Sequence, residues 1–223
     1  MDSYLVDIIH NVLVTDANPN IRHMTWYVES PAAIMSLFDV VSYSKGSRFS
    51  FHNVPKNNEL LLAGSVVHTF QQALGHSTWR KGINYWLVDR FYNFTTSAHL
   101  YENMQRAVNE DYPINPPNVA TTFGSWEWQA GFPLITVSRE GSTLSISQER
   151  FFYDRNLALS GNLWWVPLNY VVGSNPDFTS TSPDFWMENV RNMTLESSSA
   201  PKQWNESDWL LFNIQQTSYY RVN

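Results

Sequence analysis

The six histidines and one tyrosine are the candidates for metal binding and catalysis in this chain. Two histidines at i and i+4 with a glutamate between them place both imidazoles on one helix face, where they can bind zinc. No pair in this chain has that spacing; the histidines are His10, His23, His52, His68, His76 and His99. The sequence therefore predicts no metal-ligating residue of this kind. The absence of cysteine excludes thiolate ligands, a cysteine nucleophile and disulfides within these residues.

Tyr43 is the candidate catalytic residue. It stands near the end of a predicted helix that begins at Ser30-Pro31, a serine N-cap followed by proline at the first helical position. One apolar face of this helix recurs at i, i+3, i+4 and i+7, in Ile34, Leu37, Phe38 and Val41. From the residues alone two interpretations stay open: Tyr43 extends the buried face, or its phenol takes part in chemistry.

Composition sets broad limits on the fold and its partners. The 223 residues can form one large domain or two small ones. Aromatic residues make up 15% of the chain, including 10 Trp, which serves either a large core or an adhesive surface. A net charge of -6 without a basic block gives nucleic-acid binding no electrostatic support, so we expect no nucleic-acid partner.

Targeting signals are sparse. No apolar run approaches the roughly 18 residues of a membrane span. The acidic start Met1-Asp-Ser-Tyr-Leu-Val-Asp7 does not resemble a signal peptide, so we expect neither signal nor anchor in this chain. Three Asn-x-Ser/Thr sequons favour a secreted protein weakly, because chance supplies one or two; they begin at Asn93, Asn192 and Asn205.

The first part of the chain predicts a helical unit over residues 1–131. Helical periods begin near Ser65, at Ser77 as an N-cap, after Thr96, and at Val119; Gly75 is expected to stop the first of these.

At Pro133 the period changes from about 3.6 to 2. Alternating segments on either side of Arg139-Glu-Gly-Ser142 predict a hairpin, and Leu163–Val172 predicts a further strand with Pro167 at an edge or bulge. Residues 185–194 and 209–222 supply further strand material. We therefore predict an α+β chain, with a small antiparallel β-sandwich over residues 132–223.

These segments together resemble the zinc aminopeptidases of the aminopeptidase N and puromycin-sensitive class, the gluzincins. The family's Ile-x-x-x-Phe-Asp-x-x-x-Tyr-x-Lys-Gly stretch is matched by Ile34–Gly46. Further matches follow in order, at Gly75–Ile83, Tyr92–Ser97, Trp126–Pro133, Leu144–Phe151, Trp165–Leu168 and Tyr220–Asn223. The resemblance covers nearly the whole chain and implies the helical C-terminal part of a thermolysin-like catalytic domain followed by a β-sandwich domain.

The resemblance also implies a role for Tyr43. In the family, the tyrosine of Tyr-x-Lys-Gly donates a hydrogen bond to the oxyanion that forms when water attacks the first peptide carbonyl. The family uses zinc, held by His-Glu-x-x-His and a further glutamate, and a Gly-x-Met-Glu-Asn segment that holds the substrate amine. Neither motif is present here. We therefore expect this chain to bind no zinc, and to need an upstream catalytic half and a C-terminal helical domain as partners before a peptide substrate is cleaved.

Residues 47–63 depart from the family, in which Tyr-x-Lys-Gly runs almost directly into the next helix. We interpret them as an insertion of about 17 residues. We favour a gene-model fault, such as a retained intron, over a genuine loop, because the segment has no pattern of its own and the flanks join cleanly without it. Three functions stay open: part of a zinc aminopeptidase that is inactive alone, a non-catalytic module whose aromatic-rich sandwich binds protein or glycan, and a pseudoenzyme. By resemblance to the ectoenzyme branch, we expect an extracellular or cell-surface, membrane-associated glycoprotein.

Overall fold

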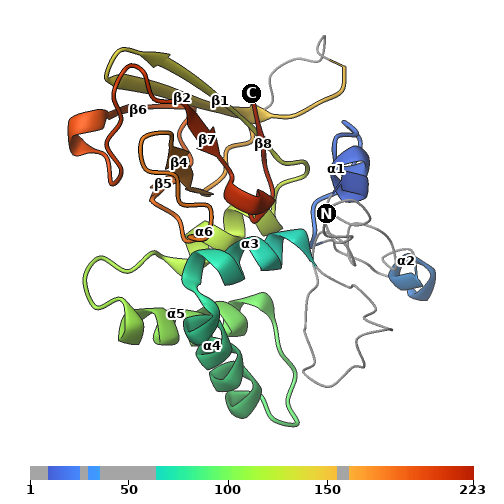
Figure 1. The fold of residues 1–223 in the computed structure, drawn as a ribbon. Coiled ribbons are helices and arrows are strands. Elements are labelled where there is room, and N and C mark those ends of the chain that lie inside the picture. Colours follow the sequence, from blue (N-terminus) through green and yellow to red (C-terminus); the bar gives the residue numbers. More distant parts are fainter. Residues whose placement is uncertain (1–9, 26–29, 36–63, 155–160) are drawn as a thin grey trace, which may run out of the picture.

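Helices form the first half of the described chain and strands the second, as the computed structural model in Figure 1 shows. The structure describes residues 10–25, 30–35, 64–154 and 161–223. Its helices are α1 (Asn11–Asp16), α2 (Pro31–Met35), α3 (Ser65–Leu74), α4 (His76–Asp89), α5 (Ser97–Asp111) and α6 (Val119–Glu127). The fold is α+β, with a helical part followed by a small β part, which confirms the predicted fold class.

Local capping explains where α2 begins. The backbone N–H of Ala33 donates to Ser30 Oγ at 3.1 Å, and Pro31 is the first helical residue, as predicted. The remainder of that predicted helix, including Tyr43, lies outside the described residues, as does the predicted insertion 47–63.

Gly75 separates two helices in a single residue. Its φ of 78° is favourable for glycine, and it ends α3 as predicted. Gly75 is also the N-cap of α4, which begins at His76, so the prediction that Ser77 caps this helix is wrong. Because one glycine both ends α3 and precedes α4, no linker residue remains for a side-chain cap.

The N-terminus of α5 carries a complete capping box. The Thr96 hydroxyl accepts a hydrogen bond from the backbone N–H of His99, and the Thr96 N–H donates to His99 Nδ1 at 3.1 Å. Histidine takes the place that glutamate or glutamine usually occupies in this motif.

The predicted hairpin forms the centre of a four-stranded sheet. Strands β1 (Pro133–Glu140) and β2 (Thr143–Arg150) pair antiparallel, and the sheet order is β6-β2-β1-β8, with β6 (Asn192–Glu196) and β8 (Arg221–Val222) at the edges. One pairing departs from the predicted antiparallel arrangement, because β8 runs parallel to β1. The chain reaches β8 through a long connection rather than a hairpin, and such a connection permits a parallel neighbour.

Two short ladders accompany this sheet among the described residues. Strand β3 (Val166–Leu168) pairs with β5 (Phe185–Met187), and β4 (Tyr170–Val172) pairs with β7 (Leu210–Phe212). The predicted strand Leu163–Val172 is thus divided at Asn169. Within the described residues β3 has one strand neighbour, so Pro167 occupies an edge, as predicted.

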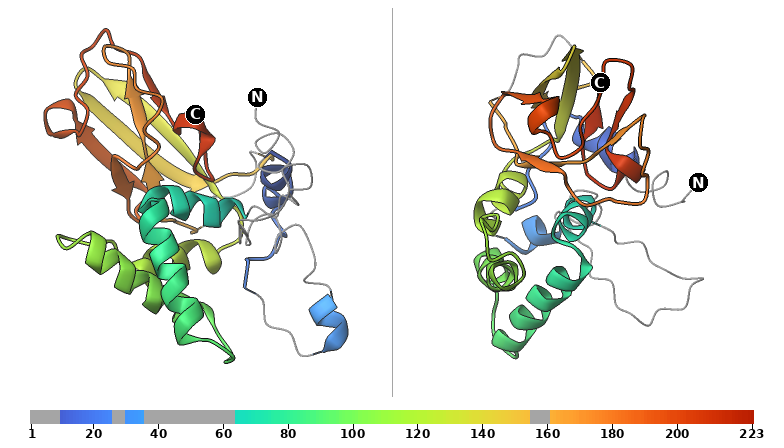
Figure 2. Two further views of the ribbon diagram at one scale, coloured as in Figure 1. Left: turned by 60° about the horizontal axis from the view of Figure 1, so that its bottom comes forward. Right: turned by 60° about the vertical axis from the view of Figure 1, so that its left-hand side comes forward.

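Helices α3 and α6 lie between the strands and the α4–α5 pair (Figures 1 and 2). One apolar cluster runs through this layer into the β part. Within it, the ring centroid of Trp126 lies 6.4 Å from those of both Phe70 and Tyr219. Helix ends at Glu127 and strand begins at Pro133, while side-chain packing continues across the junction. The division into domains 1–131 and 132–223 stays a prediction.

No helix within the described ranges has the length and apolar character needed to cross a membrane.

Candidate functional site

The residue that the sequence singles out for catalysis, Tyr43, lies outside the described residues, and its position is therefore a prediction. The structure does describe the segments on both sides of it along the chain. Two buried carboxylates, Asp16 and Glu127, fix the preceding segment, residues 10–25, against the helices and the strands.

Asp16 joins α1 to two distant parts of the chain. Its side chain is 1% exposed. Oδ1 accepts a hydrogen bond from the backbone N–H of Gly131 at 3.2 Å, and Oδ2 accepts one from the Tyr219 hydroxyl at 3.1 Å. Burial, and then the negative charge of Asp16, raise the pKa of Tyr219 well above its ordinary value. The phenol is therefore neutral at physiological pH and serves as a permanent donor to the carboxylate.

Glu127, the last residue of α6, holds the end of the same segment. It accepts hydrogen bonds from Thr25 Oγ1 at 2.5 Å and from the Tyr101 hydroxyl, and its backbone carbonyl accepts the Thr25 N–H at 3.5 Å. Burial, and then the hydrogen bond to Glu127, raise the pKa of Tyr101 far above its ordinary value. Both hydroxyls donate to the Glu127 carboxylate, which therefore anchors the segment that ends at Thr25 to helices α5 and α6.

A cavity of about 290 Å³ adjoins this anchor. Helices α3, α4, α5 and α6 and residues 24–25 line it. The lining is mainly apolar, with Val66, Phe70, Trp79 and Phe123 beside Glu127 and Tyr101. A largely apolar cavity with one carboxylate, already bonded to two hydroxyls, suits an apolar side chain better than a charged ligand.

The described residues do not fit a metal site. Within the ranges that the structure describes, no group of three or more His, Cys, Asp and Glu residues could hold a metal ion. Two histidines have structural contacts instead: His99 caps α5, and His10 Nε2 lies 3.3 Å from Gln216 Oε1. His76 is exposed at the start of α4, and His52 falls outside the described residues.

The motif Trp126–Pro133 forms the joint between the helical and β parts. Trp126 Nε1 donates to the Trp165 carbonyl at 2.7 Å, and Gln129 Nε2 donates to the Leu163 carbonyl at 2.6 Å. Gly131 has a φ of 83°, and a Cβ there would collide with the side chain of Arg150. Each of these three residues of the motif therefore has a structural role at the joint.

The motif Leu144–Phe151 has a similar structural role. Gln148 is 1% exposed, and the two N–H groups of its Nε2 are shared among the carbonyls of Trp164, Glu188 and Val190, which lie at 2.9 Å, 3.0 Å and 2.9 Å. Its Oε1 accepts the Trp164 N–H at 2.9 Å. One buried amide thus binds two other segments of the β part, at residue 164 and at residues 188–190, to strand β2.

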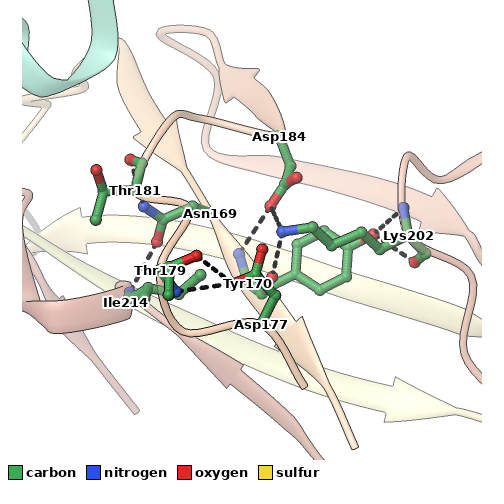
Figure 3. A network of polar contacts seen from close by, with 8 residues as sticks. All are labelled: Asn169, Tyr170, Asp177, Thr179, Thr181, Asp184, Lys202 and Ile214. Carbon is green, nitrogen blue, oxygen red and sulfur yellow. Dashed lines mark hydrogen bonds and ion pairs between the residues drawn. The ribbon is translucent and has the colours of Figure 1, made fainter. Parts of the chain in front are cut away.

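A second polar network, around Tyr170 and Lys202, lies within the β part (Figure 3). Lys202 Nζ donates to Asp184 Oδ2 at 2.9 Å and to the Tyr170 carbonyl at 2.8 Å. The Tyr170 hydroxyl donates to the Lys202 carbonyl at 2.5 Å and accepts the Lys202 N–H at 2.9 Å. Burial raises the pKa of Tyr170 to about 12. Each group is satisfied by another member, so the network fixes the loop at residue 202 to β4.

These anchors were not found from the sequence. Asp16, Glu127, Lys202 and Asp184 have no distinguishing neighbours in the chain, and their partners lie far away in sequence. The one available signal was a polar residue inside an apolar pattern, as at Glu127 between Trp126 and Trp128.

Comparison with known proteins gives a similarity that extends along the whole chain. The chain is 28% identical to aminopeptidase N of Plutella xylostella and 30% identical to aminopeptidase N of Rattus norvegicus, with 100% of the chain covered in both cases. It is 25% identical to the human thyrotropin-releasing hormone-degrading ectoenzyme over 99% of its length. The chain spans about a fifth of these relatives, 22%, 21% and 19% of their respective lengths. No family model matches it.

Proposed function

Because the chain belongs to the aminopeptidase N family, we propose that it is a segment of a zinc metallo-aminopeptidase, an enzyme that hydrolyses the N-terminal residue from a peptide. The observation that carries this proposal is the extent of the similarity. It runs through all 223 residues rather than around one motif, and it includes relatives from insects, birds and mammals that share aminopeptidase names.

In this proposal Tyr43 is the transition-state donor. Its hydroxyl donates a hydrogen bond to the oxyanion that forms as water attacks the scissile carbonyl. A donor that meets charge present only in the transition state lowers the barrier instead of tightening substrate binding.

The test of Tyr43 is a Tyr43→Phe substitution in the enzyme that contains this segment, assayed on an aminoacyl-anilide. We expect kcat to fall by about 10²–10³-fold with little change in KM, since one oxyanion donor is worth that much. An unchanged kcat would remove Tyr43 from the mechanism.

The zinc ligands are proposed to belong to other parts of a longer protein. The chain contains no His-Glu-x-x-His, and its described residues do not fit a metal. The purified 223 residues, with zinc added, should neither retain stoichiometric zinc after gel filtration nor hydrolyse an aminoacyl-anilide. Hydrolysis that Tyr43→Phe abolishes would overturn this part of the proposal.

Residues 47–63 are proposed to be additional to the family's pattern and to derive from a retained intron. Sequencing of the transcript across codons 46 to 65 tests this directly. Mature message that lacks these codons and continues upstream into a His-Glu-x-x-His exon supports the enzyme segment. Message that begins at Met1 and retains these codons refutes the intron. It favours a non-catalytic binding module or a pseudoenzyme, because a loop directly after Gly46 can displace Tyr43. We also propose that the protein lies at the cell surface or outside the cell, because the family it resembles includes membrane-associated ectoenzymes.

A second function, contact with glycan through the β part, is favoured by one exposed aromatic pair. The rings of Phe178 and Trp209 stack with centroids 6.2 Å apart, and both side chains are about half exposed. Sugars bind on such flat, exposed rings. Titration of the chain with a panel of oligosaccharides should quench tryptophan fluorescence, and Trp209→Ala should abolish the response. No response to any member of the panel rejects this function.

A further inference from the structure

An apolar surface surrounds Asn93 in the turn between α4 and α5. Three aromatic side chains adjacent to it are strongly exposed: Phe91 at 72%, Tyr92 at 97% and Phe94 at 72%. The last turn of α4 adds exposed Leu87 and Val88. Five large apolar side chains exposed within eight residues form a patch of the kind that is normally covered by something.

The turn itself is held in a defined shape. Tyr92 adopts a left-handed conformation with a φ of 57°, and the backbone N–H of Asn93 donates to the Arg90 carbonyl at 2.9 Å. Trp86 Nε1 donates to Thr95 Oγ1 at 2.7 Å, which ties the end of the turn to α4. Asn93 Oδ1 accepts the Phe94 N–H at 2.9 Å. Asn93 is exposed, and its amide nitrogen is the atom that an N-linked sugar occupies.

We propose that Asn93 carries an N-linked glycan whose first sugar packs against Phe91 and covers this patch. The sequence Phe91-Tyr-Asn93-Phe-Thr95 combines the acceptor sequon with an aromatic residue two positions before the asparagine. The apolar C–H face of a pyranose complements the negative face of an aromatic ring. The hydrogen bonds that hold the turn, and the exposure of Phe91 two positions before Asn93, would reduce the ordering that this contact costs.

The modification balances as a simple group transfer. Asn93 Nδ2 attacks the anomeric carbon of an oligosaccharide carried on a polyprenyl pyrophosphate lipid. The new bond joins Nδ2 to that carbon, the bond between that carbon and the pyrophosphate oxygen breaks, and the amide releases one proton. No oxidant or reductant takes part.

The other two sequons serve as internal controls. The residue two positions before Asn192 is Val190, and the residue two positions before Asn205 is Gln203, so neither has the aromatic partner. Trypsin places the three asparagines on separate peptides, 91–106, 192–202 and 203–221, because arginine or lysine bounds each of them. One digest therefore reports all three sites.

The experiment secretes the full 223-residue chain from eukaryotic cells behind a cleavable leader. Treatment with peptide N-glycosidase F in ¹⁸O-water then converts each glycosylated asparagine to labelled aspartate, which mass spectrometry counts. We expect label on peptide 91–106 in most molecules. Phe91→Ala should lower that occupancy at least twofold, while Ile114→Ala, which removes another exposed apolar side chain away from the sequon, should leave it unchanged.

A second measurement tests the packing of the sugar. Removal of the glycan should lower the melting temperature of the wild type and of Ile114→Ala by roughly 2–4 °C, the shift expected from one lost stacking contact in a chain of this size. The melting temperature of Phe91→Ala, which lacks the ring, should not change when the glycan is removed. An unlabelled 91–106 peptide in the wild type overturns the site. Equal occupancy and equal melting shifts in wild type and Phe91→Ala overturn the contact with Phe91. Neither outcome bears on the aminopeptidase proposal, which concerns Tyr43 and the peptide substrate.

Discussion

The hydrogen bond from Tyr219 to Asp16 should contribute measurably to the stability of the whole chain. Tyr219→Phe removes one hydroxyl and keeps the ring in its place among Trp126 and Phe132. Asp16 Oδ2 then loses its donor at 3.1 Å in a site where the carboxylate is 1% exposed, so water cannot replace it at low cost. A hydrogen bond to a charged group is worth about 1.5–3 kcal/mol, and we expect this loss in the free energy of unfolding.

Urea denaturation followed by tryptophan fluorescence measures this loss. The matched control is Tyr220→Phe, the same change at the adjacent buried residue. The Tyr220 hydroxyl lies near the backbone N–H groups of Asn169 and Asn213 but forms no hydrogen bond with any described residue. Removing it should change the free energy of unfolding by less than about 0.5 kcal/mol or increase it slightly, since a buried unsatisfied hydroxyl is lost. If the two variants unfold at the same urea concentration, the assigned role of Asp16 is wrong.

Three further predictions concern other parts of the frame. Gly131→Ala should destabilise the chain by about 1–3 kcal/mol in the same assay, because φ is 83° and an arginine side chain occupies the space of a Cβ; a neutral effect would contradict the tight joint. Glu127→Gln replaces one carboxylate oxygen by an NH2 group, so either the Thr25 or the Tyr101 hydroxyl loses its acceptor. The segment of residues 10–25 is then held less firmly, and trypsin should cut after Arg22 several-fold faster than in the wild type. An equal rate of cleavage would show that Glu127 does not anchor this segment. The hydrogen bond from Lys81 holds the pKa of Asp111 below its ordinary value, so Asp111 stabilises the fold above about pH 4 and loses that contribution as the pH falls through its folded-state pKa. The free energy of unfolding of Asp111→Asn should therefore differ from that of the wild type at about pH 6 and converge with it near pH 2. A difference that does not depend on pH would exclude the charge as the cause.

Most helices and the central hairpin were predictable because their signals are local. Thr143–Arg150 alternates in burial as its sequence alternates, and the hydrophobic period of α5 appears in four buried or half-buried positions. The prediction failed at Ser77 for an equally local reason. A serine in the first turn is an ordinary N-cap, but the positive φ of Gly75 had already turned the chain, so the helix begins before the serine is reached.

Composition left open whether the aromatic residues serve a core or a surface, and the structure has them in both places. Trp126 and Trp164 are fully buried and join the helical to the β part. Phe91, Tyr92 and Phe94 are exposed around one asparagine. Counting aromatic residues could not separate these groups, because burial depends on which surfaces the fold brings together.

The sequence by itself determined the order of helices and strands, the position at Pro133 where one gives way to the other, and the family. Each of these depends on residues a few positions apart or on a pattern shared with relatives. Only the tertiary structure decided that the Tyr219 hydroxyl donates to Asp16, 203 positions away, and that the Thr25 hydroxyl donates to Glu127, 102 positions away. Such pairs carry no local pattern, because an isolated Asp or Tyr is compatible with any solvent-facing position. They become visible once the packing of the core has brought the distant segments together and excluded water from between them.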